Sequence, residues 1–416
     1  MTYFMEDSLT SKSVLHRMTG LFLCCVLSAG AQAQTTPAPT PPPPPPPAAA
    51  APAAPAAAPL AMPAMIGPLS TASPATFDAG RYFGKLQVTG ILSGFVYVQD
   101  NHSLSDHLKY ADVSNAQVFV QKTSGLVQYY LQGGAYNLPA LGTPFLSTRD
   151  TVTDFFGALP QGYIKLAPKG SFSYLAGKLP TLIGAEDTFT FENMNIERGL
   201  LWNQENAVNR GLQVNYSKGK ISSSLTWNDG FYSNRYNWIT GLFTYTANAA
   251  NSVEFVGGGN YGKTGYSSVA TPLYQNNSSI YNVIYTHTAK KWILEPYIQI
   301  THVPMNTDIG VWHATSTIGG AVLGTYTFTP HFTLAARGEY LASTGSTSDG
   351  SVNLMYGTGS DAWSMTLTPT YQDNAFFARA EFSAVHAMDT TAGDVFGSSG
   401  NNATQVRGMI EAGFMF

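Results

Sequence analysis

Few residues of this chain stand at spacings that would support catalysis or metal binding. His102 and His107 flank Asp106, a set that could ligate a metal ion, but no second ligand cluster accompanies them, so we expect solvated loop histidines. Residues 257–262 read GGGNYG and match the GxGxxG phosphate-binding pattern. A dinucleotide site needs a helix directly after that turn, whereas a polar loop rich in Gly, Ser and Thr follows. The sequence therefore predicts neither a metal site nor a cofactor site.

A hydrolytic site built on neighbouring β-strands would need a serine and a histidine in register. His287 and His386 lie near the ends of predicted strands, and neither has a serine at a matching position. We therefore expect a protein that is not an enzyme. The net charge of −4 argues against nucleic acid as a partner.

Charged residues two positions apart predict a polar wall. Arg337 and Glu339 lie in the sequence ARGEY, and Arg379 and Glu381 lie in ARAEF, so an extended chain places Arg and Glu on one face in both segments. Two interpretations are open: the charges pair and fill an interior, or they line a pore, which the width of the predicted barrel favours. Five basic and five acidic residues decide nothing about ion selectivity. The pore-lining candidates are Lys165, Lys178, Glu254, Glu295, Arg337, Glu339, Arg379, Glu381, Arg407 and Glu411.

Residues 181–209 form the longest predicted loop and mix large apolar with charged side chains. An exposed loop would gain little from its six large apolar residues, whereas a loop folded into a lumen could pack them against the inner wall. We expect this loop to constrict the pore; the alternative is an external loop that caps the barrel or contacts a neighbouring subunit. Five acidic residues against one basic predict a weak preference for cations. The constriction-loop candidates are Glu186, Asp187, Glu192, Glu197, Arg198 and Glu205.

The elements that must position these residues are β-strands. Only 11% of the 416 residues are Asp, Glu, Lys or Arg, against about 25% in soluble domains. From residue 85 onward apolar and polar residues alternate, so that Leu86, Val88, Leu92 and Val96, for example, share one face. The pattern predicts sixteen strands near 85–100, 113–122, 126–135, 160–167, 172–180, 210–216, 221–227, 238–247, 253–261, 280–288, 292–302, 315–328, 332–342, 362–371, 376–386 and 404–416.

The connections between these strands alternate in length. Seven short turns separate eight long polar loops, and both ends of the strand region lie on the short-turn side. This arrangement predicts an all-β fold: a transmembrane antiparallel up-and-down β-barrel of about 16 strands in a bacterial outer membrane, with short periplasmic turns and long extracellular loops. A soluble sandwich has no reason to gather its long loops at one end.

The last stretch, residues 404–416, ends the chain on Phe416. Val406, Ile410 and Phe414 share one face with it, and that face suits hydrocarbon. The stretch resembles the closing strand of bacterial outer-membrane barrels, and the resemblance implies that Phe416 belongs to the signal read by the barrel-insertion machinery. We expect outer-membrane lipids and that machinery as partners, and a homo-oligomer remains open.

The N-terminal region predicts export. A basic segment, the apolar run 21–27 and a following Ala-Gln-Ala indicate a signal peptide over residues 1–33. Both cysteines of the chain, Cys24 and Cys25, lie inside it, so the mature chain would contain none. Leu23 stands where a lipoprotein signal has a small residue, which argues against lipidation.

Residues 34–80 are rich in Pro and Ala and include seven consecutive prolines. Proline fixes φ and lacks a backbone donor, so this stretch is expected to be an extended periplasmic linker without a core. It could not form the plug domain of an active transporter. The barrel is expected over residues 81–416.

Several short motifs resemble those of a known family. Residues 175–179 read LAGKL, residues 183–186 read IGAE, an Arg-x-Glu pattern recurs on late strands, and the chain ends in Phe416. In these features the region 81–416 resembles the OmpL-like β-barrel porins of the porin-2 type. The resemblance implies an outer-membrane porin, a water-filled channel for passive diffusion of small hydrophilic solutes and ions, without catalytic residues. The open alternative is a non-conducting structural or adhesive barrel that displays its extracellular loops.

Overall fold

The computed structural model describes residues 65–71, 74–103 and 105–416. The predicted signal peptide (1–33) and much of the predicted linker (34–80) lie outside the described residues. Within the described part of the chain, no helix is long and apolar enough to cross a membrane.

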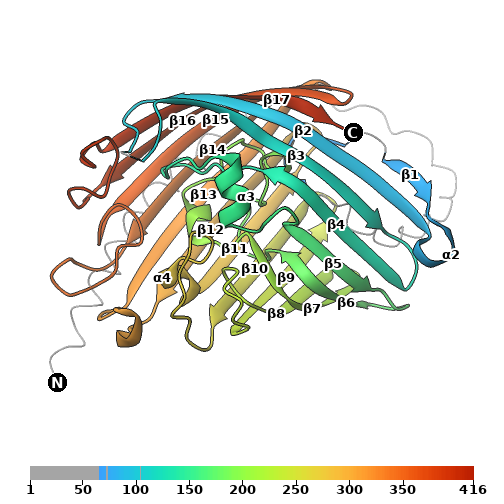
Figure 1. Ribbon diagram of the computed structural model, residues 1–416, viewed down its shortest axis with the longest axis horizontal. Coiled ribbons are helices and arrows are strands. Elements are labelled where there is room, and N and C mark those ends of the chain that lie inside the picture. The colour runs from blue at the N-terminus through green and yellow to red at the C-terminus, as the bar shows by residue number, and fades with distance from the viewer. Residues whose placement is uncertain (1–64, 72–73, 104) are drawn as a thin grey trace, which may run out of the picture. The chain divides into compact units, whose positions relative to one another are not determined.

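Sixteen antiparallel strands, β2 to β17, form a closed barrel. Each strand pairs with its neighbours in sequence, and β17 pairs with β2, where Glu411 lies opposite Phe95, so the sheet closes on itself (Figure 1). The predicted number and antiparallel order of the strands are confirmed. The strands are β2 (Lys85–Gln99), β3 (Lys109–Lys122), β4 (Val127–Tyr136), β5 (Gln161–Leu166), β6 (Phe172–Pro180), β7 (Val208–Lys218), β8 (Ile221–Asn228), β9 (Trp238–Asn248), β10 (Asn251–Asn260), β11 (Ser279–Thr288), β12 (Trp292–Val303), β13 (Thr315–Thr329), β14 (Phe332–Ser343), β15 (Asp361–Asp373), β16 (Phe376–Met388) and β17 (Thr404–Met415).

In the described residues, helical structure is confined to short pieces outside the strands. The longest is α3, where Ser147 caps the helix by accepting a hydrogen bond from the backbone N–H of Asp150. Short turns and long connections alternate along the chain as predicted. The helical pieces are α2 (Gly80–Phe83), α3 (Thr148–Asp154), α4 (Leu273–Asn276), and the 3-10 turns η1 (Thr190–Glu192), η2 (Leu201–Gln204) and η3 (Thr307–Ile309).

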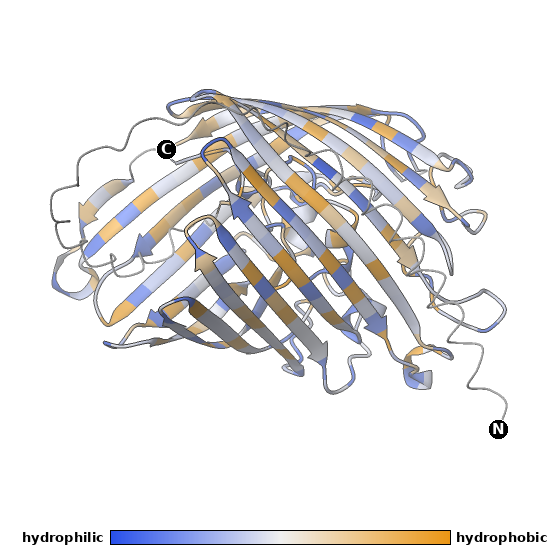
Figure 2. Ribbon diagram, turned by 180° about the vertical axis from the view of Figure 1, so that it is seen from behind, coloured by the Kyte–Doolittle hydropathy of each residue, from blue (hydrophilic) through white to orange (hydrophobic). Residues whose placement is uncertain are grey.

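The two faces of the barrel wall differ in polarity. Along β17 the side chains of Val406, Ile410 and Phe414 are exposed on the outside, whereas Arg407 and Glu411 are buried inside. Figure 2 shows hydrophobic and hydrophilic residues alternating along many strands. Such a surface, apolar on the outside of a closed barrel, matches the hydrocarbon of a membrane.

Part of the predicted linker is folded onto the barrel, contrary to the prediction of a spacer without a core. β1 (Ala75–Asp78) pairs with the first four residues of β2, with Ala75 opposite Val88 and Asp78 opposite Lys85. These residues of β2 extend beyond the last residue of β17 and would otherwise leave backbone groups unpaired. The sequence pattern did not reveal β1 because a four-residue strand is too short to show alternation.

The terminal residue closes the barrel through a contact with β2. Phe416 and Gly90 exchange two backbone hydrogen bonds, of 2.7 and 2.9 Å. A Cβ atom added to Gly90 would lie 2.5 Å from the ring of Phe416, so only glycine leaves room for that ring. The ring of Phe416 therefore occupies the space beside Gly90 on the first barrel strand.

Candidate functional site

Residues 181–207 connect β6 to β7 and fold into the barrel; they are called the lumenal segment from here on. Phe189, Phe191 and Leu201 within it are fully buried. The ring of Phe191 packs against the ring of Phe119, an inward residue of β3, with centroids 5.6 Å apart. The inner wall therefore removes the large apolar side chains of this loop from water.

A buried asparagine holds the middle of the lumenal segment in shape. The side-chain amide of Asn193 donates to the carbonyls of Asp187 and Phe189, at 2.8 Å each, and its oxygen accepts from the N–H of Asp187 at 2.7 Å. The Glu192 carboxylate accepts from the N–H of Phe189 at 3.0 Å. These bonds satisfy backbone groups that a tight turn leaves without partners.

Arg337 of β14 joins the lumenal segment to the wall. Its guanidinium pairs with Glu186 of the segment at 2.5 Å and with Glu339 of its own strand at 3.3 Å. It also donates to the carbonyl of Glu197 at 2.7 Å. All these groups are buried, and a buried charge needs such partners to offset its loss of hydration.

Arg379 of β16 makes a second link of the same kind. It pairs with Glu411 of β17 at 2.6 Å and donates to the carbonyls of Thr190 and Asn193, at 2.8 and 3.1 Å. The hydroxyl of Thr190 in turn donates to Glu411 at 3.0 Å. One arginine therefore ties the wall to two backbone positions of the lumenal segment.

The acidic wall residues receive backbone N–H groups of the segment. Glu381 accepts from Ile196 and Glu197, at 2.5 and 2.9 Å. Glu339 accepts from Leu200 and Leu201, at 3.0 and 3.3 Å. The carboxylates thus hold two separate stretches of the segment by charge-assisted hydrogen bonds.

Six of the predicted pore-lining residues are therefore covered. Each faces inward from β14 to β17 as the alternation predicts, but none exceeds 3% exposure. The prediction that they border a water-filled pore is corrected here, because the lumenal segment lies on them and supplies their partners. The structure supports the alternative interpretation, in which charges pair and fill the interior. The six residues are Arg337, Glu339, Arg379, Glu381, Arg407 and Glu411, with Arg407 paired to Glu197 of the segment.

Three further candidates lie on other strands of the wall, β5, β10 and β12. Lys165 on β5 and Glu254 on β10 are partly exposed, and Glu254 accepts a hydrogen bond from Thr244 at 3.2 Å. Glu295 on β12 is buried and accepts one from Thr286 at 3.1 Å. Glu295 lies two strands from Arg337 in the same register, but among the described residues none of the three forms an ion pair with the charged cluster of β14 to β17.

Lys178 departs from its predicted position. It lies in register with Gly162, on the same face as exposed Ile164, whereas Leu175 and Leu179 of its own strand point inward and are buried. The prediction that Lys178 lines the lumen is therefore wrong. Its ammonium group donates hydrogen bonds to the backbone carbonyls of residues 156 and 159, at 3.0 and 2.8 Å. The connection between β4 and β5 therefore provides hydrogen-bond partners for a charge on the outer face.

The remaining charges of the lumenal segment have fewer partners: Arg198, Glu192 and Glu205 are buried, and Asp187 is partly buried. Arg198 lies over the ring of Trp202 at 4.8 Å, and among the described residues its nitrogens have no hydrogen-bond partner. Burial lowers the pKa of Arg198 to about 10. Burial and the neighbouring Glu186 raise the pKa of Glu205 well above its usual range and that of Asp187 to about 7. For Glu192, burial and the charge of Asp187 also raise the pKa well above its usual range.

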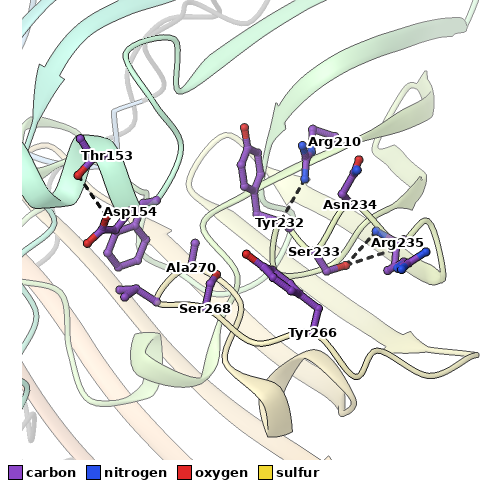
Figure 3. Close-up of a pocket in the computed structure, with 12 residues that line it drawn as sticks. Thr153, Asp154, Arg210, Tyr232, Ser233, Asn234, Arg235, Tyr266, Ser268 and Ala270 are labelled. Atoms are coloured by element: carbon purple, nitrogen blue, oxygen red, sulfur yellow. Dashed lines mark hydrogen bonds between the residues drawn. The ribbon is translucent and has the colours of Figure 1, made fainter.

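A cavity of about 940 Å³, lined by both polar and apolar residues, lies on the long-loop side, among α3 and the β8–β9 and β10–β11 connections (Figure 3). Arg210 of β7 borders it, pairs with Asp229 at 2.7 Å and lies over the ring of Tyr232 at 3.9 Å. Tyr232 adopts φ 56°, a left-handed conformation that is rare for a bulky residue. The sequence gives no local signal for this cavity, because three separate loops contribute its walls.

The residues considered for metal binding serve the loop structure. Asp106 is buried and accepts hydrogen bonds from Tyr97 at 2.9 Å and Gln99 at 2.8 Å, while His107 stacks on Tyr110. Among the residues that the structure describes, no group of three or more His, Cys, Asp or Glu side chains is arranged to hold a metal ion.

A closed sixteen-stranded barrel with an apolar outside, a polar inside and an internal loop defines a bacterial outer-membrane barrel of the porin class. A family model described as "Putative beta-barrel porin-2, OmpL-like" matches residues 85–416, and the chain belongs to this family. The family predicted from the sequence motifs is confirmed. A comparison with curated protein sequences finds no match.

Solved structures share the fold at low sequence identity. The trimer form of in-vitro folded OmpT of Vibrio cholerae has a TM-score of 0.54 at 12% identity and covers 80% of this chain and 99% of its own. The outer membrane channel DcaP of Acinetobacter baumannii has a TM-score of 0.53 at 9% identity, covering 80% and 97%. OmpF of Salmonella typhi in complex with daunomycin has a TM-score of 0.52 at 12% identity, covering 80% and 98%. At these identities the likeness extends to the fold alone.

Proposed function

We propose that the protein is a channel for passive diffusion of small hydrophilic solutes and ions, with the lumenal segment as its constriction. The observation that carries this proposal is the position of the lumenal segment, held by buried ion pairs inside a sixteen-stranded barrel. Solutes would move down their gradients, selected by the width and charge of the path beside the segment. DcaP, which shares the fold, is described as an outer membrane channel.

We place the path along a partly exposed, polar stretch of the inner wall. Inward residues of β5 and β7 to β11 near the short turns are polar and partly exposed. Further along these strands Thr226, Asn228 and Thr240 are buried, which supports a proposed path that narrows at the lumenal segment. The polar residues of the proposed path are Lys165, Gln213, Asn215, Ser222, Ser224, Thr244, Glu254 and Thr286.

A weak preference for cations follows from the charges at the proposed constriction. The lumenal segment carries five acidic candidates and one arginine, and Glu186 and Glu197 are paired with arginines of the wall. Burial favours the neutral forms of Glu192 and Glu205, so the negative field is smaller than the residue count suggests. Selectivity should therefore be weak and clearest at low salt.

A non-conducting structural barrel is the second candidate, favoured by the burial of all six inward charges on β14 to β17. Planar bilayer recordings of the purified protein separate the two. A diffusion channel gives discrete conductance steps and a reversal potential displaced toward the cation equilibrium in a salt gradient. A folded protein that yields no steps at any voltage would contradict the channel proposal. Liposome swelling with sugars of graded size would then report the width of the path.

We also propose that the barrel forms a homo-oligomer in the membrane, since one structure of the same fold is a trimer form. Mass measurement of the detergent-extracted protein, corrected for bound detergent, tests this. A mass equal to one chain in every mild detergent would contradict it.

A further inference from the structure

Residues 65–71, which precede the barrel, contact the lumenal segment directly. The backbone N–H groups of Ile66 and Gly67 both donate to the carbonyl of Glu192, at 2.9 and 3.0 Å. Glu192 is buried within the lumenal segment, so residues 65–71 enter the barrel to reach it. The lumenal segment is therefore contacted both by the barrel wall and by residues 65–71.

Glycine is required at the closest point of this contact. A Cβ atom on Gly67 would lie 2.2 Å from the carbonyl oxygen of Asn193. The same carbonyl oxygen of Asn193 also accepts a hydrogen bond from Arg379, at 3.1 Å. Residues 65–71 therefore press against the backbone position at which a wall arginine holds the lumenal segment.

Leu69 belongs to an apolar cluster that includes wall residues near the short turns. It is 4% exposed, and the cluster includes inward residues of β2, β3, β16 and β17. Inward positions of a hydrated lumen are normally polar, so exposure of these apolar side chains to water would be unfavourable unless another part of the chain covered them. Phe191 of the lumenal segment and Leu69 belong to one cluster with the four wall residues Ile91, Phe119, Phe377 and Met415.

The last part of the stretch is clamped by a turn. Gln372, at the short-turn end of β15, accepts from the backbone N–H of Ser70 at 2.9 Å and donates to the backbone carbonyl of Ser70 at 2.7 Å. This reciprocal pair imitates the hydrogen bonds between two strands. The hydroxyl of Ser70 is 3.5 Å from Gln372 and adds little.

We propose that residues 65–71 form a latch that docks in the short-turn end of the lumen and holds the lumenal segment against the wall of β14 to β17. Four features connect this stretch to parts of the barrel that are remote in sequence. They are the backbone hydrogen bonds to Glu192, the close approach at Gly67, the packing of Leu69 over the apolar cluster and the hydrogen bonds between Ser70 and Gln372. Because it carries no charge, the latch is held by packing and backbone bonds and releases without breaking an ion pair. Its release frees the lumenal segment and widens the path; that last step rests on the proposed channel function.

Docking is tested without reference to conduction. In a background with Cys24 and Cys25 replaced, the pair S70C and Q372C should link rapidly through a short bifunctional thiol reagent. Adding Gly67→Val, which introduces the clash with Asn193, should abolish the link. Hydrogen exchange of amides in residues 181–207 should rise in Gly67→Val and in Leu69→Asp, while Ser70→Ala, which keeps both backbone bonds to Gln372, should match the wild type.

Conductance tests the consequence of docking. Gly67→Val and Leu69→Asp should raise the open-state conductance, and linking S70C to Q372C should suppress that rise until the link is cleaved. Retained heat-modifiable migration shows that each variant is folded; if one does not fold, the linked pair alone decides. The proposal is overturned by failure of the pair to link, or by unchanged exchange of residues 181–207 in both disruptive variants. If hydrogen exchange of residues 181–207 changed but no variant conducted ions, the result would support the latch and contradict the proposed channel function.

Discussion

Arg379 of β16 and Glu411 of β17 form a fully buried ion pair of 2.6 Å on neighbouring strands. Glu411 also accepts from Thr190, and Arg379 donates to two carbonyls of the lumenal segment. The pair therefore binds a loop to a wall while neutralising both charges. Removal of one partner would leave the other charge buried alone, which makes this pair the sharpest test of how the lumenal segment is held.

Arg379→Met should loosen the lumenal segment at a cost of about 3–5 kcal/mol, the usual penalty for breaking a buried pair. Denaturant titration of the detergent-folded barrel measures this loss. Lys165→Met, which removes a partly exposed inward charge, serves as the control and should change stability little. Equal stability of the two variants would show that the pair does not hold the segment.

Deletion of residues 187–204 should raise single-channel conductance and reduce cation preference. The deletion removes most of the lumenal segment, including three acidic residues at the proposed constriction. Conductance and reversal potential in a salt gradient are the two measurements. If both stay at wild-type values in a folded barrel, the segment lies outside the path.

Leu294→Arg and Leu367→Arg should each destabilise the barrel by about 2–4 kcal/mol if the positions lie near the bilayer midplane. Both side chains are exposed on the outer wall, at 42% and 51%. Ser224→Arg is the matched control, because Ser224 faces inward and is partly exposed. Refolding yields into lipid vesicles compare the three variants, and equal yields would argue against a lipid-facing outer wall.

Gly90→Val should impair barrel closure, because the new side chain collides with the ring of Phe416. Deletion of Phe416 should likewise leave exported protein that inserts poorly. Gly338→Val is the control, since an added Cβ there meets no atom within 4 Å. Heat-modifiable, protease-resistant barrel is the measured quantity, and wild-type amounts in both Gly90→Val and the deletion would contradict the role of this contact.

The packing of the lumenal segment should weaken as pH rises from about 4 to about 7. Burial and Glu186 raise the pKa of Asp187 from 3.8 to about 7, so in this interval the packed segment retains a proton that the released segment gives up. The free energy of releasing the segment therefore becomes more favourable as the pH rises through this interval. Above pH about 7 Asp187 is ionised in both states and contributes no further change. Hydrogen exchange of residues 181–207 across this range measures the effect. Asp187→Asn should make the dependence shallower, while Glu192 and Glu205, whose pKa burial also raises, account for the remainder. An identical profile would assign the whole dependence to those other groups.

The sequence by itself determined the wall of this protein. Strand periodicity and turn residues act locally, so the outward face of β17 with Val406 and Phe414, the alternation of short and long connections and the antiparallel order could all be read from the chain. A closed barrel also restricts topology, because each strand pairs with its sequence neighbours. The family motifs pointed to the same fold.

Only the tertiary structure decided what the lumen contains. Arg337 and Glu186 are 151 residues apart, and no local pattern states that they pair or that the wall charges are thereby buried. Lys178 was misplaced because a loop near 156–159 satisfies its charge on the outer face, an effect of loop position on a strand end. Leu69 lies in a stretch whose composition indicates a linker, yet it packs in an apolar cluster assembled from strands at both ends of the barrel sequence and from the lumenal segment. Long-range contacts of this kind depend on closure of the barrel, which brings remote strands around one interior.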